Sequence, residues 1–138
     1  MSRSRDIPHG VYRRSMATHT ITATNFDETL DGGGIVLLDF WAEWCGPCRM
    51  FGPIFEAASE KYPDMVFGKV DTEVERELSS GFQITSIPTL MAFRDGILVF
   101  SQPGALPAAG LQQVVDAVQG LDMDDVRAQI AAQSDASA

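Results

Sequence analysis

The sequence predicts an α/β domain with a mixed central β-sheet flanked by helices on both faces. Short apolar stretches of strand character alternate with longer stretches whose apolar residues recur at helical spacing, which is the pattern of parallel β-α-β units. Towards the end of this alternation, Asp95-Gly96 separates two apolar runs and predicts a tight turn between antiparallel strands. The predicted element order is therefore β-α-β-α-β-α-β-β-α.

Each strand is expected where apolar or alternating residues are bounded by turn signals. The alternation Thr20-Ile21-Thr22 predicts a short edge strand within residues 17–24. The run from Ile35 to Trp41 is apolar except for Asp39, which predicts a strand covered on both faces of the sheet. Three further strands are expected at 65–70, 90–93 and 97–100.

The helices are expected where apolar residues return every three or four positions. Asn25 lies where its side chain could cap the first helix, and Pro53 inside the second removes one backbone hydrogen bond. The acidic group of Glu73, Glu75 and Glu77 is interpreted as a solvated helix face, with no function assigned. The expected helices cover 26–30, 45–62, 73–82 and 107–119.

The chain of 138 residues is long enough for one domain with a sizeable core. Residues 1–17 are expected to be a disordered basic leader, residues 18–120 the folded domain, and residues 121–138 a C-terminal extension. In that extension, Val126 and Ile130 have helical spacing, so one more short helix is expected before a frayed end at 133–138. No apolar run approaches the ~18 residues of a membrane-spanning helix.

The charge of the chain is unevenly distributed. The leader holds Arg3, Arg5, Arg13 and Arg14 against Asp6, a net of +3, which leaves −12 on the rest of a chain whose total is −9. This acidity argues against a nucleic-acid partner. The leader has no apolar segment after its arginines, so we expect no export and a cytoplasmic location; translation from Met16 is the alternative.

The chain has only two cysteines, Cys45 and Cys48, which lie between the buried strand and the following helix. The positive end of a helix stabilises a thiolate, so Cys45 is expected to be the attacking sulfur and the one nearer the solvent. Cys48, one turn into the helix, would resolve the mixed disulfide. Gly46-Pro47 restricts the loop and keeps the two sulfurs within bonding reach.

A zinc site is the competing interpretation of a cysteine pair, but zinc normally needs four ligands. No second cysteine pair exists, and the only histidines, His9 and His19, lie before the predicted domain and at its very start. We therefore expect a redox-active pair and no bound metal.

Asp39 is the second candidate for chemistry. It is either a strand residue that reaches water or a buried carboxylate whose raised pKa suits a general base for Cys48. Lys69 of the neighbouring apolar strand is either its partner or a solvated strand end. Pro88 opens a strand, where its peptide bond can be cis, and Trp44, outside the strand and beside Cys45, is expected on the recognition surface.

Taken together, these residues resemble the thioredoxin family over about residues 18–120. The resemblance rests on motifs in the order and spacing of the family: Asp39-Phe40-Trp41-Ala42-Glu43-Trp44-Cys45-Gly46-Pro47-Cys48, Pro53, Lys69-Val70-Asp71, Ile87-Pro88-Thr89, Gly96 and Gly104-Ala105-Leu106. The chain departs from the family at Arg49, which is often lysine, and at the two extra ends.

The resemblance implies the thioredoxin fold and a thiol–disulfide oxidoreductase with a redox-active Cys45–Cys48 disulfide. It implies a buried acid at Asp39 with Lys69 beside it, and a cis bond between Ile87 and Pro88. The apolar surface that holds target proteins would consist of Trp44, Gly46, Pro47, Ile87, Pro88, Gly104 and Ala105. The protein would be a monomer without a bound cofactor, supplied with electrons from NADPH by the flavoprotein thioredoxin reductase.

Reduction of protein disulfides is the leading functional hypothesis, because Gly-Pro between the cysteines resembles the reducing members of the family. A disulfide oxidase or isomerase of the same fold is one alternative. A redox-independent binding or chaperone-like module is another, although such a module need not keep both cysteines and the acid.

Overall fold

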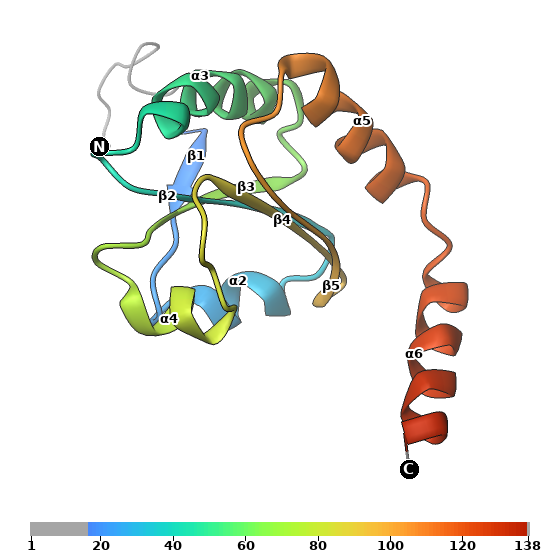
Figure 1. Ribbon diagram of the computed structural model, residues 1–138. Helices are drawn as coiled ribbons and strands as arrows, with labels where there is room; N and C mark the ends of the chain where they lie inside the picture. The colour runs from blue at the N-terminus through green and yellow to red at the C-terminus, as the bar shows by residue number, and fades with distance from the viewer. Residues whose placement is uncertain (1–16, 138) are drawn as a thin grey trace, which may run out of the picture.

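The computed structural model describes residues 17–137 as one α/β domain followed by a C-terminal helix (Figure 1). The basic leader was expected to be disordered, and almost all of its residues lie outside this range. The elements are β1 (Thr18–Thr20), α2 (Phe26–Asp31), β2 (Ile35–Trp41), α3 (Gly46–Lys61), β3 (Val66–Asp71), α4 (Arg76–Gly81), β4 (Thr89–Arg94), β5 (Ile97–Pro103), α5 (Ala108–Gln119) and α6 (Met123–Ser137). This order confirms the predicted fold class.

The five strands form one mixed sheet in the order β1-β3-β2-β4-β5. β1, β3 and β2 are parallel, whereas β4 runs antiparallel to both β2 and β5. The register pairs Asp39 of β2 with Lys69 of β3, and Thr20 of β1 with the same lysine. Polar residues from three adjacent strands thus share one level of the sheet.

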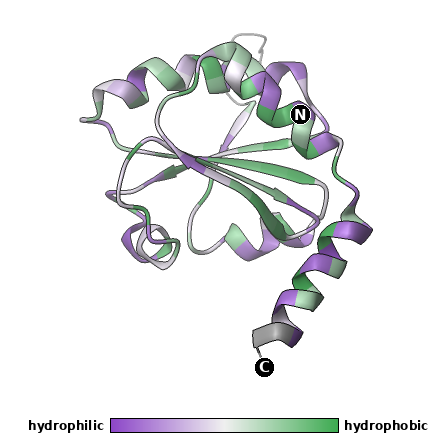
Figure 2. Ribbon diagram, turned by 45° about the vertical axis from the view of Figure 1, so that its right-hand side comes forward, coloured by the Kyte–Doolittle hydropathy of each residue, from purple (hydrophilic) through white to green (hydrophobic). Residues whose placement is uncertain are grey.

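Helices cover both faces of the sheet, as Figure 1 shows. α3 and α5 pack on one face, and α2 and α4 pack on the other. Figure 2 shows the hydrophobic strands enclosed between helices of mixed hydropathy. The first core contains Leu37, Phe51, Phe55, Phe67, Leu90 and Leu111, and the second contains Ile21, Val36, Leu38, Phe40, Val70, Met91 and Phe93.

Two local predictions have different outcomes. The turn between β4 and β5 has Asp95 at φ 53° and Gly96 at φ 81°, which is the left-handed backbone of a tight hairpin turn. Asn25 does precede α2, but its side chain makes no capping hydrogen bond to the helix. Its Oδ1 instead accepts from the Thr22 N–H at 2.8 Å and its Nδ2 donates to the Thr20 carbonyl, so it stabilises the turn before the helix.

Three element boundaries lie three or more residues from their predicted positions, and β1 ends at Thr20, where the alternation that predicted it begins. β5 extends to Pro103 because its pairing with β4 continues along the sheet edge. α4 begins only at Arg76, so Glu73 and Glu75 precede the helix. α6 continues to Ser137, where a short helix with a frayed end was expected; nothing between 123 and 137 is a helix-breaking glycine or proline.

α6 is attached at the end of the sheet that carries the β4–β5 turn. Arg94 donates to the carbonyls of Val118, Gln119 and Leu121, at 2.8 to 3.1 Å, and so holds the end of α5 and the linker. Arg127 Nη2 of α6 lies 3.5 Å from Asp95 Oδ2. Beyond these contacts the helix points away from the domain (Figure 1).

Candidate active site

A disulfide bond joins Cys45 and Cys48 where β2 leads into α3, with 5.3 Å between their Cα atoms. Cys45 is the residue that caps α3, and its Sγ accepts the Cys48 N–H at 3.2 Å. Gly46 and Pro47 form the first turn, where proline loses no helical hydrogen bond. The N-terminus of α3 therefore directs an N–H and the positive end of its dipole at the Cys45 sulfur.

Both cysteines are almost fully buried, which differs from the expectation that Cys45 is nearer the solvent. Cys45 is 3% exposed and Cys48 is 5% exposed. The reason is the segment before β4, because Cys45 Sγ lies 3.6 Å from the Ile87 carbonyl oxygen and packs beside its side chain. This contact comes from a residue 42 positions away in the sequence.

Asp39 is completely buried beneath this site, so the interpretation of a residue that reaches water is wrong. Lys69 Nζ lies 3.4 Å from Asp39 Oδ2, while Oδ1 has no hydrogen-bond partner among the described residues. Burial raises the pKa of Asp39 to about 6, against the opposing effects of the Lys69 charge and hydrogen bond. The Lys69 ammonium also lies 5.3 Å from the centre of the Trp41 ring.

The other expected site residues come from three segments. Gly46 and Pro47 are exposed at the start of α3, and Trp44 before them is 67% exposed. Ile87 and Pro88 are joined by a cis peptide bond. The Gly104 N–H donates to the Pro88 carbonyl at 2.8 Å, which brings Gly104 and the exposed Ala105 next to the cis bond.

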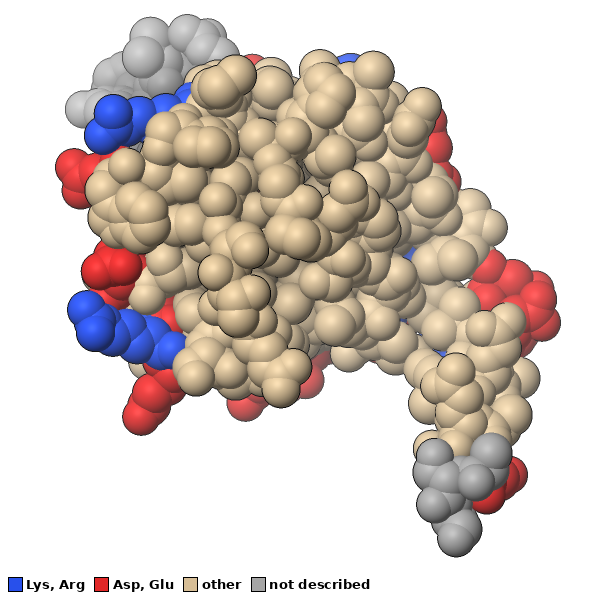
Figure 3. Space-filling view, viewed as in Figure 1, with Lys and Arg blue, Asp and Glu red and all other residues tan. Residues whose placement is uncertain are grey.

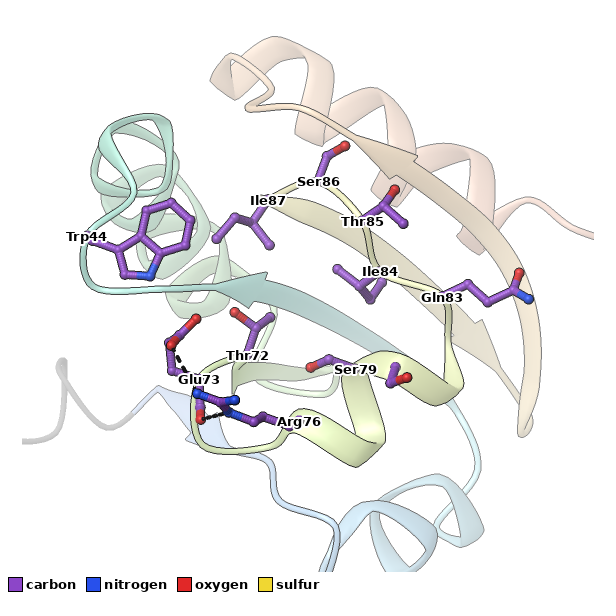
Figure 4. A pocket seen from close by; sticks show the side chains of 11 residues that line it. Trp44, Thr72, Glu73, Arg76, Ser79, Gln83, Ile84, Thr85, Ser86 and Ile87 are labelled. Atoms are coloured by element: carbon purple, nitrogen blue, oxygen red, sulfur yellow. Dashed lines mark hydrogen bonds and ion pairs between the residues drawn. The ribbon is translucent and has the colours of Figure 1, made fainter.

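A hollow of about 870 Å³ lies between Trp44 and α4, with Ile87 on its wall (Figure 4). Apart from Trp44, Ile84 and Ile87, its lining is polar: Thr72, Glu73, Arg76, Ser79, Ser80, Gln83, Thr85 and Ser86. The sequence did not indicate this polar wall, since α4 carried no motif. Glu73 and Arg76 pair with each other at its rim, 3.6 Å apart.

Charged side chains are concentrated away from the middle of the face seen in Figure 3. Acidic and basic side chains of the described residues line the rim, and the centre, where Figure 1 draws β4 and β5, shows uncharged surface. A partner approaching this face therefore meets little charge at its centre.

Two further properties concern residues 17–137 alone. No group of three or more His, Cys, Asp or Glu side chains among them could hold a metal ion. No helix in this range is long and apolar enough to cross a membrane.

Comparison with known proteins gives a consistent result. Residues 17–117 match the thioredoxin family. A Streptomyces coelicolor protein assigned as thioredoxin 2 is 55% identical over 117 residues, which cover 85% of this chain and 87% of that protein. Thioredoxin 1 of Synechococcus elongatus is 42% identical over 103 residues, covering 74% of this chain and 96% of the relative.

Solved structures agree with the fold. A mutant thioredoxin from Halobacterium salinarum NRC-1 superimposes with a TM-score of 0.71 and 28% identity, covering 76% of this chain and 93% of that chain. Plasmodium falciparum thioredoxin gives a TM-score of 0.68 and 35% identity, covering 72% of this chain and 98% of the other. With a Cys-Gly-Pro-Cys disulfide at the start of α3, the chain belongs to the thioredoxin family and is a thiol–disulfide oxidoreductase.

Proposed function

We infer that the protein works as a reductant of disulfide bonds in other proteins. The observation that carries this proposal is the Cys45–Cys48 disulfide at the N-terminus of α3, beside the exposed Trp44. A helix N-terminus favours the thiolate form, and stabilising the reduced pair in this way suits chemistry that begins with a thiolate. The surface around it offers uncharged residues to a polypeptide.

In the first step, the Cys45 thiolate of the reduced protein attacks one sulfur of a target disulfide. A bond forms between Cys45 Sγ and that sulfur, the target S–S bond breaks, and the other target sulfur leaves as a thiolate that takes a proton from water. The Cys48 N–H, which donates to Cys45 Sγ, would stabilise the attacking anion.

In the second step, Cys48 attacks Cys45 Sγ and releases the second target thiolate. The Cys48 thiol must lose its proton for this attack, and Asp39 is the proposed acceptor, through a water molecule. A carboxylate whose pKa is raised to about 6 is a stronger base near neutral pH than an ordinary aspartate. Two cysteine thiols are thereby oxidised to a disulfide, and the target disulfide is reduced to two thiols.

Target polypeptides would bind across the residues around the disulfide. Trp44, Gly46 and Pro47 would contact the target on one side, and Ile87 and Pro88 with Gly104 and Ala105 on the other. This assignment is supported by the exposure to solvent of five of these residues: Trp44, Gly46, Pro47, Gly104 and Ala105.

The electrons would come from NADPH through a flavoprotein thioredoxin reductase, so the chain itself would need no bound cofactor. We further propose that the protein acts as a monomer in the cytoplasm. Membership of the thioredoxin family supports this last pair of assignments.

The direct test is NADPH-dependent reduction of insulin disulfides in the presence of a thioredoxin reductase. The expected result is steady NADPH oxidation that requires both cysteines. A double variant, Cys45→Ser with Cys48→Ser, is the matched control and should show none. If the double variant were as active as the wild type, or if the wild type only oxidised a reduced peptide, the proposed reductase function would be wrong.

A further inference from the structure

A second carboxylate, partly buried, belongs to α3, the helix that carries Cys48, and has no part in the mechanism above. Glu56 is half-buried on α3, and its Oε1 accepts a hydrogen bond from Thr18 Oγ1 of β1 at 3.1 Å. Its Oε2 is buried and has no hydrogen-bond partner among residues 17–137. A buried carboxylate oxygen without a donor is costly, so a nearby cation would stabilise it.

The candidate for this cation is the ammonium of Lys69, whose side chain lies against α3. A Cβ on Gly52 would lie 3.7 Å from Lys69 Nζ, so the ammonium rests against α3 at Gly52. Glu56 follows Gly52 by four residues and lies on the same face of the helix, about 6 Å further along its axis.

The strand register gives the same placement independently. α3 runs antiparallel to β3, as the crossover helix of a parallel strand pair does. A step of four residues forward along α3 therefore corresponds to a step of two residues back along the strands. That step leads from Lys69 to Phe67 on β3 and from Thr20 to Thr18 on β1. The Thr18–Glu56 hydrogen bond lies at that level. Asp39, Lys69 and Glu56 therefore lie in a row beneath α3, with the ammonium between two carboxylates.

We propose that Glu56 is a positioning residue for the Asp39–Lys69 pair, and that it competes with Asp39 for the Lys69 ammonium. Lys69 has three N–H donors, and Asp39 Oδ2 is the acceptor it has among the described residues. When Asp39 takes a proton, its ionic attraction for Lys69 is lost, and the ammonium turns to Glu56. Glu56 thereby lowers the cost of protonating Asp39.

The charged and titratable groups around Asp39 come from two elements. Lys69 faces it from β3, and Glu56 and the disulfide-bonded Cys48 belong to α3; β4 presents the apolar Leu90 beside it. With the disulfide intact, neither cysteine titrates, and Lys69 is the charged group that lowers the Asp39 pKa; Glu56 would act on Asp39 through this lysine. This inference concerns the regulation of the proposed general base, and it rests on that proposed function for its catalytic meaning.

The test is the pKa of Asp39, followed by the carboxyl ¹³C shift in NMR spectra of the oxidised protein. Glu56→Gln keeps the shape but removes the charge and leaves Lys69 to Asp39, so the Asp39 pKa should fall by about 0.5 or more. Glu60→Gln is the matched control, since Glu60 is an exposed carboxylate one turn further along α3. It should leave the Asp39 pKa at the wild-type value.

A double-mutant cycle with Lys69→Met shows whether the lysine carries the effect. In that background, Glu56→Gln should change the Asp39 pKa much less than it does in the wild type. An unchanged Asp39 pKa in Glu56→Gln, an equal fall in Glu60→Gln, or a full effect without Lys69 would each overturn the proposal. This titration needs no turnover, so a failure of Asp39 as a catalytic base would appear separately, as an insulin-reduction rate unaffected by Asp39→Asn.

Discussion

At the scale of single residues, the unusual feature is an acid buried without full compensation. Asp39 is 0% exposed, and among residues 17–137 only one of its two carboxylate oxygens has a partner. The single Lys69 contact at 3.4 Å does not offset the desolvation, since the pKa remains raised to about 6 from 3.8. An acid kept at such a cost in stability is typical of a functional site.

Asp39→Asn should make the protein more stable at neutral pH and slow the resolving step. The raised pKa means that the folded state binds more protons than the unfolded state between pH 4 and 6, so the ionised acid destabilises the fold increasingly over that range. Above pH 6 the full cost remains, and removing it should stabilise the fold by up to about 3 kcal/mol. The unpaired Lys69, which is 26% exposed, reduces this gain.

Urea unfolding of the oxidised protein from pH 3 to 8 measures the stability effect, which should vanish below about pH 4. Asp64→Asn, which removes an exposed aspartate, is the matched control and should show no such trend. Single-turnover reduction of a disulfide peptide measures the kinetic effect, and a loss of up to about 100-fold is expected. A resolving rate unchanged between pH 6 and 9 would exclude Asp39 as the base.

At the scale of elements, the site depends on how closely β3 lies against its neighbours. Gly68 on β3 faces the second core, where an added Cβ would lie 2.9 Å from Leu38 Cδ2 and closer still to Ile21 Cγ1. Gly68 precedes Lys69 on β3. The close packing of side chains against this glycine therefore also positions Lys69, the partner of Asp39. The absence of a side chain here is a packing requirement.

Gly68→Ala should therefore destabilise the protein by about 1–3 kcal/mol, the usual cost of overpacking a core. Gly81→Ala, at the end of α4, is the matched control because a Cβ there meets nothing within 4 Å. Thermal and urea unfolding of both variants would check this. Equal stability of Gly68→Ala and the wild type would show that Ile21 and Leu38 can move aside without cost.

Arg94 is the residue that joins the end of α5 to the extension. Arg94→Met removes three hydrogen bonds to carbonyls and a positive charge near a helix C-terminus, which should cost about 1–3 kcal/mol. Arg127→Met breaks only exposed ion pairs and should cost less than about 1 kcal/mol. If urea unfolding showed equal losses for the two variants, Arg94 would not be the main residue that holds the linker between α5 and α6.

The sequence predicted the element order, the mixed sheet and the cysteine pair, because these depend on local periodicity and on a motif. It did not predict the burial of Cys45, which depends on Ile87 approaching from far along the chain. Asn25 was expected to cap α2, but its amide finds nearer partners in the preceding turn. The sequence did not single out Glu56, because the residues around it belong to β1 and β3, which are distant from it along the chain. Side-chain contacts between distant segments have no pattern in a single sequence.

At the scale of the whole molecule, the redox site and the extension lie at opposite ends of the sheet. β4 begins immediately after the cis Ile87–Pro88 bond and ends at Arg94, roughly 17 Å further on. Arg94 holds the linker before α6 there, Arg127 of α6 pairs with Asp95, and Ile130 on α6 is 43% exposed. The extension therefore leaves the surface around the disulfide free.

Deleting residues 121–138 should leave disulfide reduction within about twofold of the full chain, because α6 begins at the end of the sheet opposite the disulfide. The melting temperature should fall slightly, since Met123 is buried and Leu121 accepts from Arg94. Insulin reduction and thermal unfolding of the truncated protein measure the two effects. A large loss of turnover with an intact fold would mean that α6 contributes to binding a target or the reductase.

The most direct test of the central claim is capture of the intermediate between this protein and a disulfide substrate. Cys48→Ser should accumulate a covalent mixed disulfide with insulin, because Cys45 attacks and no second thiol resolves the product. Peptide mass mapping should locate the link at Cys45, and Cys45→Ser should form far less adduct. If instead Cys45→Ser accumulated the adduct through Cys48, or if neither variant formed one, the assignment of Cys45 as nucleophile at the start of α3 would be contradicted.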